Sequence, residues 1–222
     1  TSAASGTDPK GEGAADSQST CNQDGFCDGE SQCRLWLDGT ECVAPKCTSG
    51  IGYSKRICDG SGTCGDPTQT ACDPYVCGAN ACLTTCQTDT DCIDTHYCDL
   101  GSNSCVPKKE IPEECEGNNQ CVSNFCADGV CCDTACDTEC EACDMAGSLG
   151  TCSFYPQDSD PEDDCSICTV CDGSGSCVAV PDNLDPLSEC AQEPAATCDQ
   201  DGVCDGQGAC RLWATNTVCV SP

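Results

Sequence analysis

Cysteine is the residue in this sequence with the widest range of possible chemistry. The chain holds 32 cysteines among its 222 residues, a share typical of disulfide scaffolds. Thiolates at Cys-x-x-Cys spacing ligate zinc or iron–sulfur clusters, and that spacing occurs at Cys140 and Cys143 and at Cys165, Cys168 and Cys171. The even count and acidic surroundings favour disulfides instead, so the 32 cysteines could form 16 bridges with no thiol left over.

Carboxylates are the second candidate chemistry. Asp24 and Asp28 surround a glycine turn, and Asp201 and Asp205 do the same near the other end of the chain. Oxygen ligands at alternating positions around a glycine are typical of calcium loops, although the distal Glu of an EF-hand is missing. The other interpretation is that Asp-Gly serves only as turn chemistry. Calcium binding is therefore an alternative, and we expect no other cofactor.

Catalytic constellations are missing from the sequence. His96 is the only histidine, so any histidine-dependent acid–base pair must use it, and its neighbours indicate a half-exposed loop. The motifs of zinc proteases, serine hydrolases and phosphate-binding loops do not occur. Acidic runs such as residues 158–164 are typical of solvated surface in a chain with so small a core. We therefore predict that the protein is not an enzyme.

Composition points to an oxidising compartment. Aromatic residues make up only 4% of the chain, too few for a conventional core, and disulfides can take over that role outside the cell. The net charge of −30 argues against nucleic acid and anionic membranes as partners. No apolar run approaches the ~20 residues of a membrane helix. Because the chain opens at Thr1 with no visible signal peptide, we expect a mature or trimmed product that is secreted or lies at the cell surface.

Internal repetition organises the chain. Residues 20–45 and 197–222 are identical at 16 of 26 positions without gaps, at an offset of 177 residues. The pattern Cys-Asp-Gly-x-x-x-Cys occurs four times, three times with Gly in the fifth position, and a further cysteine follows each copy. Asp-Gly between two cysteines predicts a tight hairpin. Cysteines expected to form structural disulfides include the following: Cys21, Cys27, Cys33, Cys42, Cys58, Cys64, Cys131, Cys132, Cys171, Cys177, Cys198, Cys204, Cys210 and Cys219. The sequence leaves their connectivity open, but adjacent Cys131 and Cys132 are expected to have separate partners.

The four residues Cys-Arg-Leu-Trp occur in both terminal copies, at 33–36 and 210–213. Their arginine and tryptophan are candidates for contacts with other parts of the protein or with other subunits. Trp36 and Trp213 are expected to anchor small cores, because aromatic residues are scarce here. In the alternative interpretation they lie, with Arg34 and Arg211, on a contact surface between modules or subunits, where Trp and Arg are enriched.

The middle of the chain has a different cysteine pattern. Residues 86–107 read CQTDTDCIDTHYCDLGSNSCVP, and residues 120–152 read QCVSNFCADGVCCDTACDTECEACDMAGSLGTC. The first stretch resembles the Dickkopf-type amino-terminal cysteine-rich module. Together they resemble cysteine-rich arrays of bacterial surface proteins of myxobacterial type, over roughly residues 72–177. The resemblance implies a secreted, disulfide-bonded array and no particular activity.

These observations predict a small disulfide-rich fold, an elongated array of stapled hairpins and loops with little regular secondary structure. We expect a flexible or partner-docking tail at 1–20 and two Cys-Asp-Gly modules at 21–72. A Dickkopf-like region at 73–164 and two further Cys-Asp-Gly modules at 165–222 complete the chain.

For function, the matching ends favour a non-catalytic extracellular structural protein that self-associates head-to-tail into a fibre, stalk or filament. The alternatives are an adhesin or receptor-like module that binds a protein or glycan, and a protease inhibitor. Whether the 222 residues are a whole protein or one period of a longer array stays open.

Overall fold

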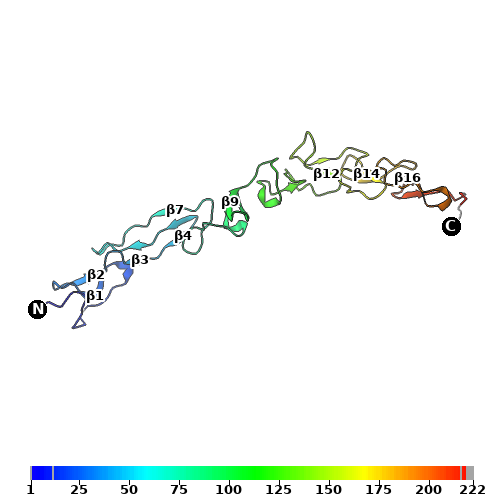
Figure 1. Cartoon of the computed structure of the whole chain (residues 1–222). Helices are drawn as coiled ribbons and strands as arrows, with labels where there is room; N and C mark the ends of the chain where they lie inside the picture. Colours follow the sequence, from blue (N-terminus) through cyan, green and yellow to red (C-terminus); the bar gives the residue numbers. More distant parts are fainter. Residues whose placement is uncertain (1, 12, 216, 219–222) are drawn as a thin grey trace. The chain divides into compact units, whose positions relative to one another are not determined.

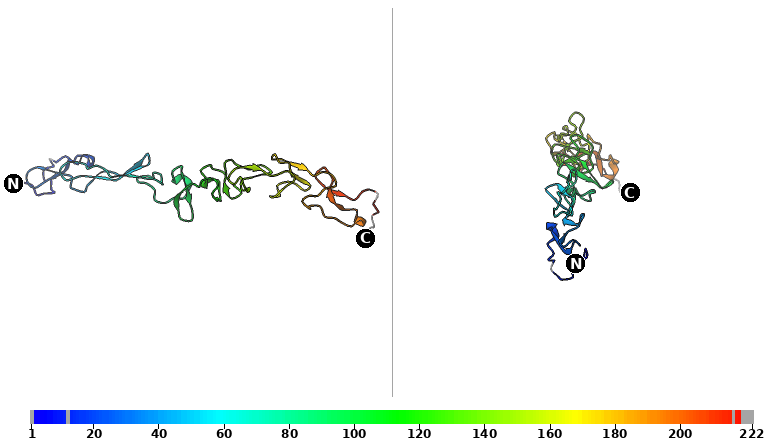
Figure 2. Two further views of the ribbon diagram at one scale, coloured as in Figure 1. Left: turned by 90° about the horizontal axis from the view of Figure 1, so that it is seen from above. Right: turned by 90° about the vertical axis from the view of Figure 1, so that its left-hand side faces the viewer.

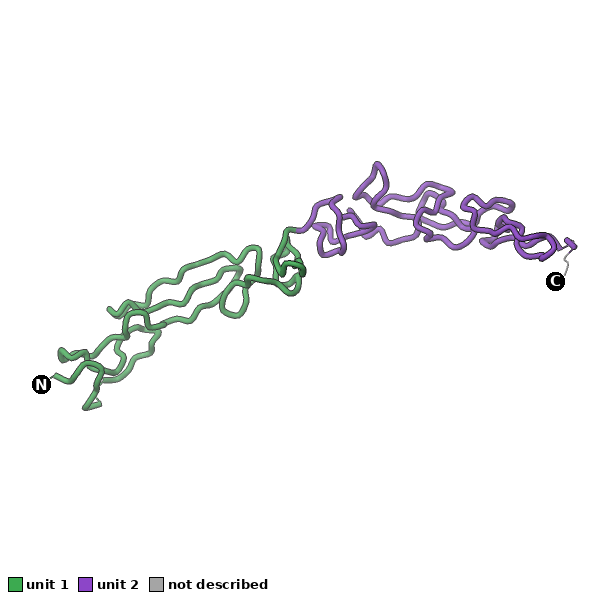
Figure 3. Tube along the Cα trace, viewed as in Figure 1, with its two compact units in different colours: residues 1–107 green, residues 108–222 purple. Residues whose placement is uncertain are grey.

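The computed structural model describes residues 2–11, 13–215, 217 and 218. Two compact units make up the chain, Thr1–Pro107 and Lys108–Pro222 (Figure 3). The boundary between them falls inside the segment 73–164. Within each unit the hairpins follow one another in chain order (Figures 1 and 2).

Regular secondary structure is limited to short strands and single helical turns. The 3₁₀ helices are η1 (Gln18–Thr20), η2 (Asp89–Asp91), η3 (Asn118–Gln120) and η4 (Ala195–Thr197). The strands of the first unit are β1 (Gln23–Cys27), β2 (Cys33–Leu35), β3 (Glu41–Val43), β4 (Lys46–Thr48), β5 (Ile51–Tyr53), β6 (Arg56–Ile57), β7 (Gln69–Ala71), β8 (His96–Asp99) and β9 (Ser104–Pro107). Those of the second unit are β10 (Cys126–Ala127), β11 (Val130–Cys131), β12 (Glu141–Ala142), β13 (Ser153–Phe154), β14 (Thr169–Cys171), β15 (Cys177–Ala179), β16 (Gln200–Cys204) and β17 (Cys210–Leu212).

The strands pair antiparallel, mostly as two-stranded hairpins. Strands β4, β5 and β7 form a three-stranded sheet, and the remaining described strands pair two by two, as β1 with β2 or β16 with β17. An isolated two-stranded hairpin is marginal in water, so these hairpins need other stabilisation. The predicted fold class, disulfide-rich with little regular secondary structure, is confirmed.

The four Cys-Asp-Gly turns share one hydrogen-bond pattern. In the second copy Asp59 Oδ1 accepts from the amides of Ser61 (2.8 Å) and Thr63 (3.0 Å), and the Asp59 amide donates to the Thr63 carbonyl. Asp28, Asp172 and Asp205 do the same in the other copies. The aspartate is therefore required as a local acceptor that closes the turn.

These hydrogen bonds favour the ionised carboxylate. The Ser61 hydroxyl and the backbone amides of Thr63 and Ser61 lower the pKa of Asp59 from 3.8 to about 2. Backbone hydrogen bonds likewise lower the pKa of Asp28 and of Asp172. Because the folded value lies below the unfolded one, the contribution is complete above pH 4 and is lost as the pH falls towards 2.

We expect the turn at Asp59 to open progressively between pH 4 and pH 2. Protonation removes the acceptor charge, so amide exchange at Ser61 and Thr63 should accelerate beyond its intrinsic pH trend. Amide exchange measured by NMR across this window, on the native chain and on Asp59→Asn, checks this. The variant should show no such step, and a step of equal size in the variant would contradict the assignment.

Fourteen disulfides join described cysteines, and they form seven crossed pairs. In each crossed pair the first cysteine bonds to the third and the second to the fourth. The pairs are Cys21–Cys58 with Cys42–Cys64, Cys47–Cys77 with Cys72–Cys82, Cys86–Cys98 with Cys92–Cys105, Cys115–Cys126 with Cys121–Cys131, Cys132–Cys143 with Cys136–Cys152, Cys140–Cys171 with Cys165–Cys177, and Cys168–Cys204 with Cys190–Cys210. Each crossed pair thus fastens a later pair of cysteines to chain that precedes it, and the first hairpin, β1 with β2, has no such pair.

The buried interior consists of small, separate clusters built around these sulfurs. One contains Cys168, Cys190 and Cys204 with Val170 and Val180, and another contains Cys21, Cys42 and Cys58, with partly buried Trp36 packed against them. Burial of so little apolar carbon cannot offset chain entropy by itself. The disulfides therefore provide the stabilisation that composition predicted.

Two expectations about cysteine can now be compared with the structure. Adjacent Cys131 and Cys132 do have separate partners, Cys121 and Cys143, as predicted. The expectation that no thiol is left over is wrong, because Cys33 is exposed and lies outside the disulfides.

Candidate functional site

Every Cys-Asp-Gly hairpin is held by the segment before it through the same two backbone hydrogen bonds. At Cys58 the amide donates to the Thr40 carbonyl (2.8 Å) and the carbonyl accepts from the Gly39 amide (3.0 Å). Cys171 makes this pair with Asp158 and Ser159, and Cys204 makes it with Asn183 and Leu184. We call each such preceding segment an arm. A cysteine follows each of these arms, namely Cys42, Cys165 and Cys190, and bonds to the second cysteine of the hairpin.

The tail segment, residues 2–11 and 13–20, is the arm of the first hairpin. The Gly6 amide donates to the Cys27 carbonyl (2.9 Å), and the Cys27 amide donates to the Thr7 carbonyl (3.0 Å). Further along, Ala15 bridges Asp24, and the indole of Trp36 donates to the Asp16 carbonyl at 3.2 Å. The tail is therefore docked on its own chain over much of its length.

The last hairpin repeats these contacts at the offset of 177 residues. Gln192 bridges Asp201, and the indole of Trp213 donates to the Glu193 carbonyl at 2.9 Å. Both tryptophans are half-buried. Each one ties an arm to a hairpin, and Trp36 also packs against a small core, as the first interpretation expects.

One residue distinguishes the first arm from the others. Counting six residues on from Leu184 in the last arm gives Cys190, and six on from Thr7 in the tail gives Gly13. Cys190 bonds to Cys210, whereas the counterpart of Cys210 is Cys33. Gly13 is also crowded, since an added Cβ would lie 2.5 Å from the Gly25 carbonyl oxygen. The tail therefore reproduces the arm's hydrogen bonds and lacks its disulfide.

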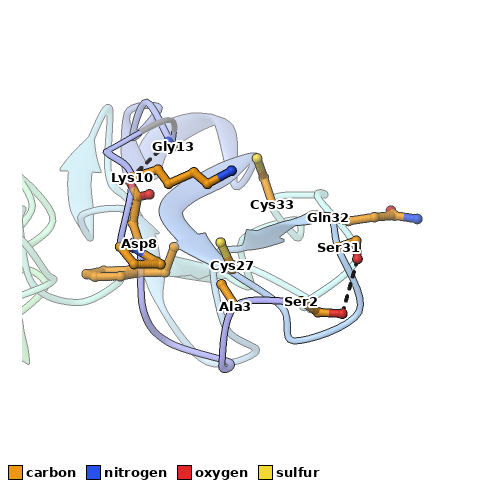
Figure 4. A pocket seen from close by; sticks show the side chains of 11 residues that line it. Ser2, Ala3, Asp8, Lys10, Gly13, Cys27, Ser31, Gln32 and Cys33 are labelled. Atoms are coloured by element: carbon orange, nitrogen blue, oxygen red, sulfur yellow. Dashed lines mark hydrogen bonds between the residues drawn. The ribbon is translucent and has the colours of Figure 1, made fainter.

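A cavity of about 490 Å³ lies between the tail and the first hairpin (Figure 4). Its lining includes Lys10 and Gly13 from the tail and Phe26 and Cys33 from the hairpin. The Phe26 side chain is 43% exposed. The counterparts of Cys33 in the later Cys-Asp-Gly hairpins, Cys64, Cys177 and Cys210, are half-buried, while Cys33 is exposed. At this cavity the tail therefore leaves part of the first hairpin, including Cys33, uncovered.

Ser31 lies in this turn at the fifth position, where the other copies have glycine. Its φ is +84°, close to the +92° of Gly62. This left-handed conformation costs a residue with a Cβ about 1–2 kcal/mol. Ser31→Gly should therefore raise the free energy of unfolding of this hairpin by about 1 kcal/mol, and the exposed Ser31–Ser2 hydroxyl contact (3.3 Å) adds little. Amide exchange around Cys33 checks this, and Gly62→Ser, which places a Cβ at φ +92° in the second turn, should have the opposite sign there.

The four calcium candidates already have partners in the protein. Asp24, which is 6% exposed, receives the Arg34 guanidinium at 2.7 Å, and Asp201 receives Arg211 at 2.7 Å. These cations occupy carboxylate oxygens that calcium would need. Asp28 and Asp205 close their own turns. Calcium binding stays a prediction, and the local geometry matches turn and ion-pair chemistry.

The other candidate chemistry is distributed as follows. The spaced cysteines Cys140, Cys143, Cys165, Cys168 and Cys171 are all in disulfides, so their sulfurs are not thiolate ligands. His96 lies half-buried on β8, with Nδ1 3.0 Å from the Thr95 hydroxyl.

The two cysteines on either side of the last hairpin have counterparts on either side of the first hairpin. At the offset of 177 residues, Cys198 corresponds to Cys21 and Cys219 to Cys42, which both bond forward to the hairpin of Cys58 and Cys64. Cys198 is disulfide-bonded; Cys219 lies outside the described residues.

The sequence predicted that Cys33 forms a structural disulfide, and it did not indicate that this cysteine is exposed and lies outside the disulfides. The signal in the sequence was glycine at position 13, where the last arm has Cys190.

Among the described residues no helix is long and apolar enough to cross a membrane. The many disulfides fit a protein of an oxidising, extracellular compartment. Comparison of the chain with protein-family models, curated proteins and solved structures gives no match.

Proposed function

We propose that this chain is a secreted, non-catalytic structural protein that assembles head-to-tail into a cell-surface fibre, stalk or filament. The observation that carries this proposal is the equivalence of its two terminal modules. The first and last hairpins have the same turn, the same Arg–Asp pair, the same indole-to-arm hydrogen bond and the same two backbone bonds to an arm. A junction that works between modules inside the chain can therefore be reused between chains.

The physical reason for a filament is that such a junction is heterologous. The face a hairpin presents to the preceding module differs from the face it presents to the following one. A contact of this kind continues from copy to copy unless its rotation closes a ring. The net charge of −30 keeps chains apart in bulk solution, so assembly needs a specific junction.

Electron microscopy of the oxidised protein tests the proposal. We expect unbranched filaments, whose length grows with protein concentration and whose mass distribution in analytical ultracentrifugation extends far beyond the monomer of 22.8 kDa. Dispersed particles with a monomer mass at every concentration would contradict it. Saturable binding to a glycan or protein without any self-assembly would favour the adhesin alternative instead.

A further inference from the structure

We propose that Cys27 and Cys33 form a reversible disulfide across the first hairpin, and that this bond is more easily reduced than the crossed bridges. It exchanges with small thiols and disulfides of the glutathione type. The bond goes beyond the proposed assembly, because it forms within one copy of the chain. Three observations carry it, namely the pairing of the two cysteines, the arm that precedes them and the space beside their side chains.

The two cysteines lie directly opposite each other in the pairing of β1 with β2. The Asp28 amide donates to the Gln32 carbonyl at 3.0 Å, so these two residues are a hydrogen-bonded pair and the next pair, Cys27 with Cys33, is a non-hydrogen-bonded one. In agreement, the amide and carbonyl of Cys27 bond to the tail segment. Residues opposite each other in such a pair have Cα atoms about 4.5 Å apart and side chains on one face. That spacing falls inside the range for disulfides.

In the other Cys-Asp-Gly hairpins these two positions bond to preceding chain and not to each other. Cys58 and Cys64 also lie opposite each other, but they bond to Cys21 and Cys42. The same holds for the opposite pairs of the two later hairpins, Cys171 with Cys177 and Cys204 with Cys210. Where the preceding chain supplies cysteines, those cysteines therefore take both sulfurs of the hairpin.

The tail segment supplies the first hairpin with no such cysteine. Residues 1–20 contain none, and Gly13 stands where the last arm has Cys190. Cys27 and Cys33 both lie outside the disulfides of the structure. Cys27 also takes part in another interaction, and the proposed bond does not require that interaction to be absent. Their cross-strand position makes each cysteine a partner that the other can reach within the hairpin.

A small disulfide has access to this pair. Both cysteines line the cavity of about 490 Å³ between the tail and the hairpin (Figure 4). Gly13 lines it too and has no side chain to fill the space. Lys10 is the one cation among the lining residues, and its ammonium can bind a carboxylate of an anionic thiol such as glutathione. The exposed Cys33 is therefore the sulfur that a small disulfide meets first.

The same geometry makes the bond easy to reduce. A Cα spacing of about 4.5 Å is near the lower end of the disulfide range, and bridges at the limits of that range are strained and more reducible. Cys33 is exposed, whereas the crossed bridges include fully buried sulfurs such as those of Cys58 and Cys204. Strained or exposed disulfides are the ones that exchange with small thiols.

The chemical step is a thiol oxidation. Cys27 and Cys33, each as a thiol, lose two protons and two electrons in total, and an S–S bond forms between their Sγ atoms. Oxidised glutathione accepts these protons and electrons as its own S–S bond breaks into two thiols. The Cys33 thiolate attacks the small disulfide and releases one glutathione, and the Cys27 thiolate then attacks the Cys33 sulfur and releases the other. Reduction runs through the same steps in reverse.

Peptide mapping tests the bond directly. The full-length chain is oxidised in a glutathione redox buffer, alkylated, and digested unreduced with a protease that cleaves before aspartate. Cleavage isolates peptides 24–27 and 28–37, whose sole cysteines are Cys27 and Cys33. We expect these two peptides to be joined by a disulfide. Peptide 28–37 found only as a thiol, as its glutathione adduct, or linked to any other peptide, a second 28–37 included, would overturn the proposal.

Stepwise reduction tests the lability of the bond. The oxidised chain is equilibrated at increasing ratios of reduced to oxidised glutathione, and new thiols are trapped with N-ethylmaleimide and located by the same mapping. We expect Cys27 and Cys33 to become labelled together, at a squared-thiol to disulfide ratio about tenfold or more below that which opens any crossed bridge. Opening together with the buried bridges would contradict the redox role.

Variants and amide exchange separate the bond from general effects on folding. Cys33→Ser should abolish the 24–27/28–37 link, while Gln32→Ala, in the same turn, should leave it unchanged. In the native chain, oxidation should slow amide exchange in β2 by about tenfold, because the bond restrains the opened hairpin. Exchange in Cys33→Ser should not respond to the glutathione ratio, and a response equal to that of the native chain would contradict the assignment.

Discussion

Removing the Cys168–Cys204 disulfide by changing both residues to alanine is expected to destabilise the last two hairpins by about 4 kcal/mol. The bridge closes 36 residues, and a long loop loses more entropy in the unfolded chain when it is closed. Both cysteines are fully buried, and the only other buried side chains of their cluster, besides Cys190, are Val170 and Val180. Little apolar packing remains to compensate for the lost bond.

The effect should be local, because the buried clusters are separate. Amide exchange should accelerate in β14–β17 and stay unchanged in β8 and β9 of the other unit. The matched comparison is the change of Cys121 and Cys131 to alanine. Their bridge spans only 10 residues, so its removal should lower the free energy of unfolding of its hairpin by about 3 kcal/mol. Equal acceleration along the whole chain would show that the modules unfold as one cooperative body, against the arrangement of the clusters.

Replacing Arg34 with glutamine should give the second largest effect, about 2–3 kcal/mol in the first hairpin. Asp24 is 6% exposed and its carboxylate accepts the Arg34 Nε–H at 2.7 Å. Without the guanidinium, a nearly buried charge keeps only the Phe26 amide as a donor. The guanidinium also lies over the Phe26 ring, 5.3 Å from its centroid, so the stacking contact is lost as well.

A second substitution separates charge from packing. Asp24→Asn in the Arg34→Gln background removes the uncompensated charge and should recover more than half of the loss. Hydrogen exchange of β1 and β2 measures both variants. Arg211→Gln in the last module is the repeat-matched control, and there Arg211 also reaches Asp182 and Asn183 of the arm, so that arm should loosen too. No recovery in the double variant would mean that stacking on Phe26 carries the effect.

Local features of this fold could be predicted because they depend on a few adjacent residues. Asp-Gly between cysteines specified a turn, since the aspartate closes it through amides two and four residues on, as Asp59 does. The scarcity of aromatic residues and the 32 cysteines specified a disulfide-stabilised, hairpin-rich chain. The equivalence of the terminal modules was visible as an identity of residues at a constant offset.

Other features could not be predicted, because they depend on distance through space. Chemically identical cysteines allow very many pairings, and only the folded chain brings Cys168 within 5.6 Å, Cα to Cα, of Cys204. From its sequence the tail was expected to be flexible or to dock on a partner. The hydrogen bonds that dock it on its own chain join backbone atoms, which every residue has, so no side chain in the sequence indicates them. Cys33 was expected in a disulfide, and its exposure followed from Gly13 at the position of Cys190.

The amino-acid sequence alone thus determined the disulfide-rich character, the turn motif and the repeated module, because each follows from composition or from neighbours along the chain. Only the tertiary structure decided the crossed pairing, the docking of Gly6 and Thr7 on Cys27, and the exposure of Cys33. These depend on which backbone edges meet in space. The order of the modules therefore follows from sequence, and the direction in which each module fastens to the next follows from the fold.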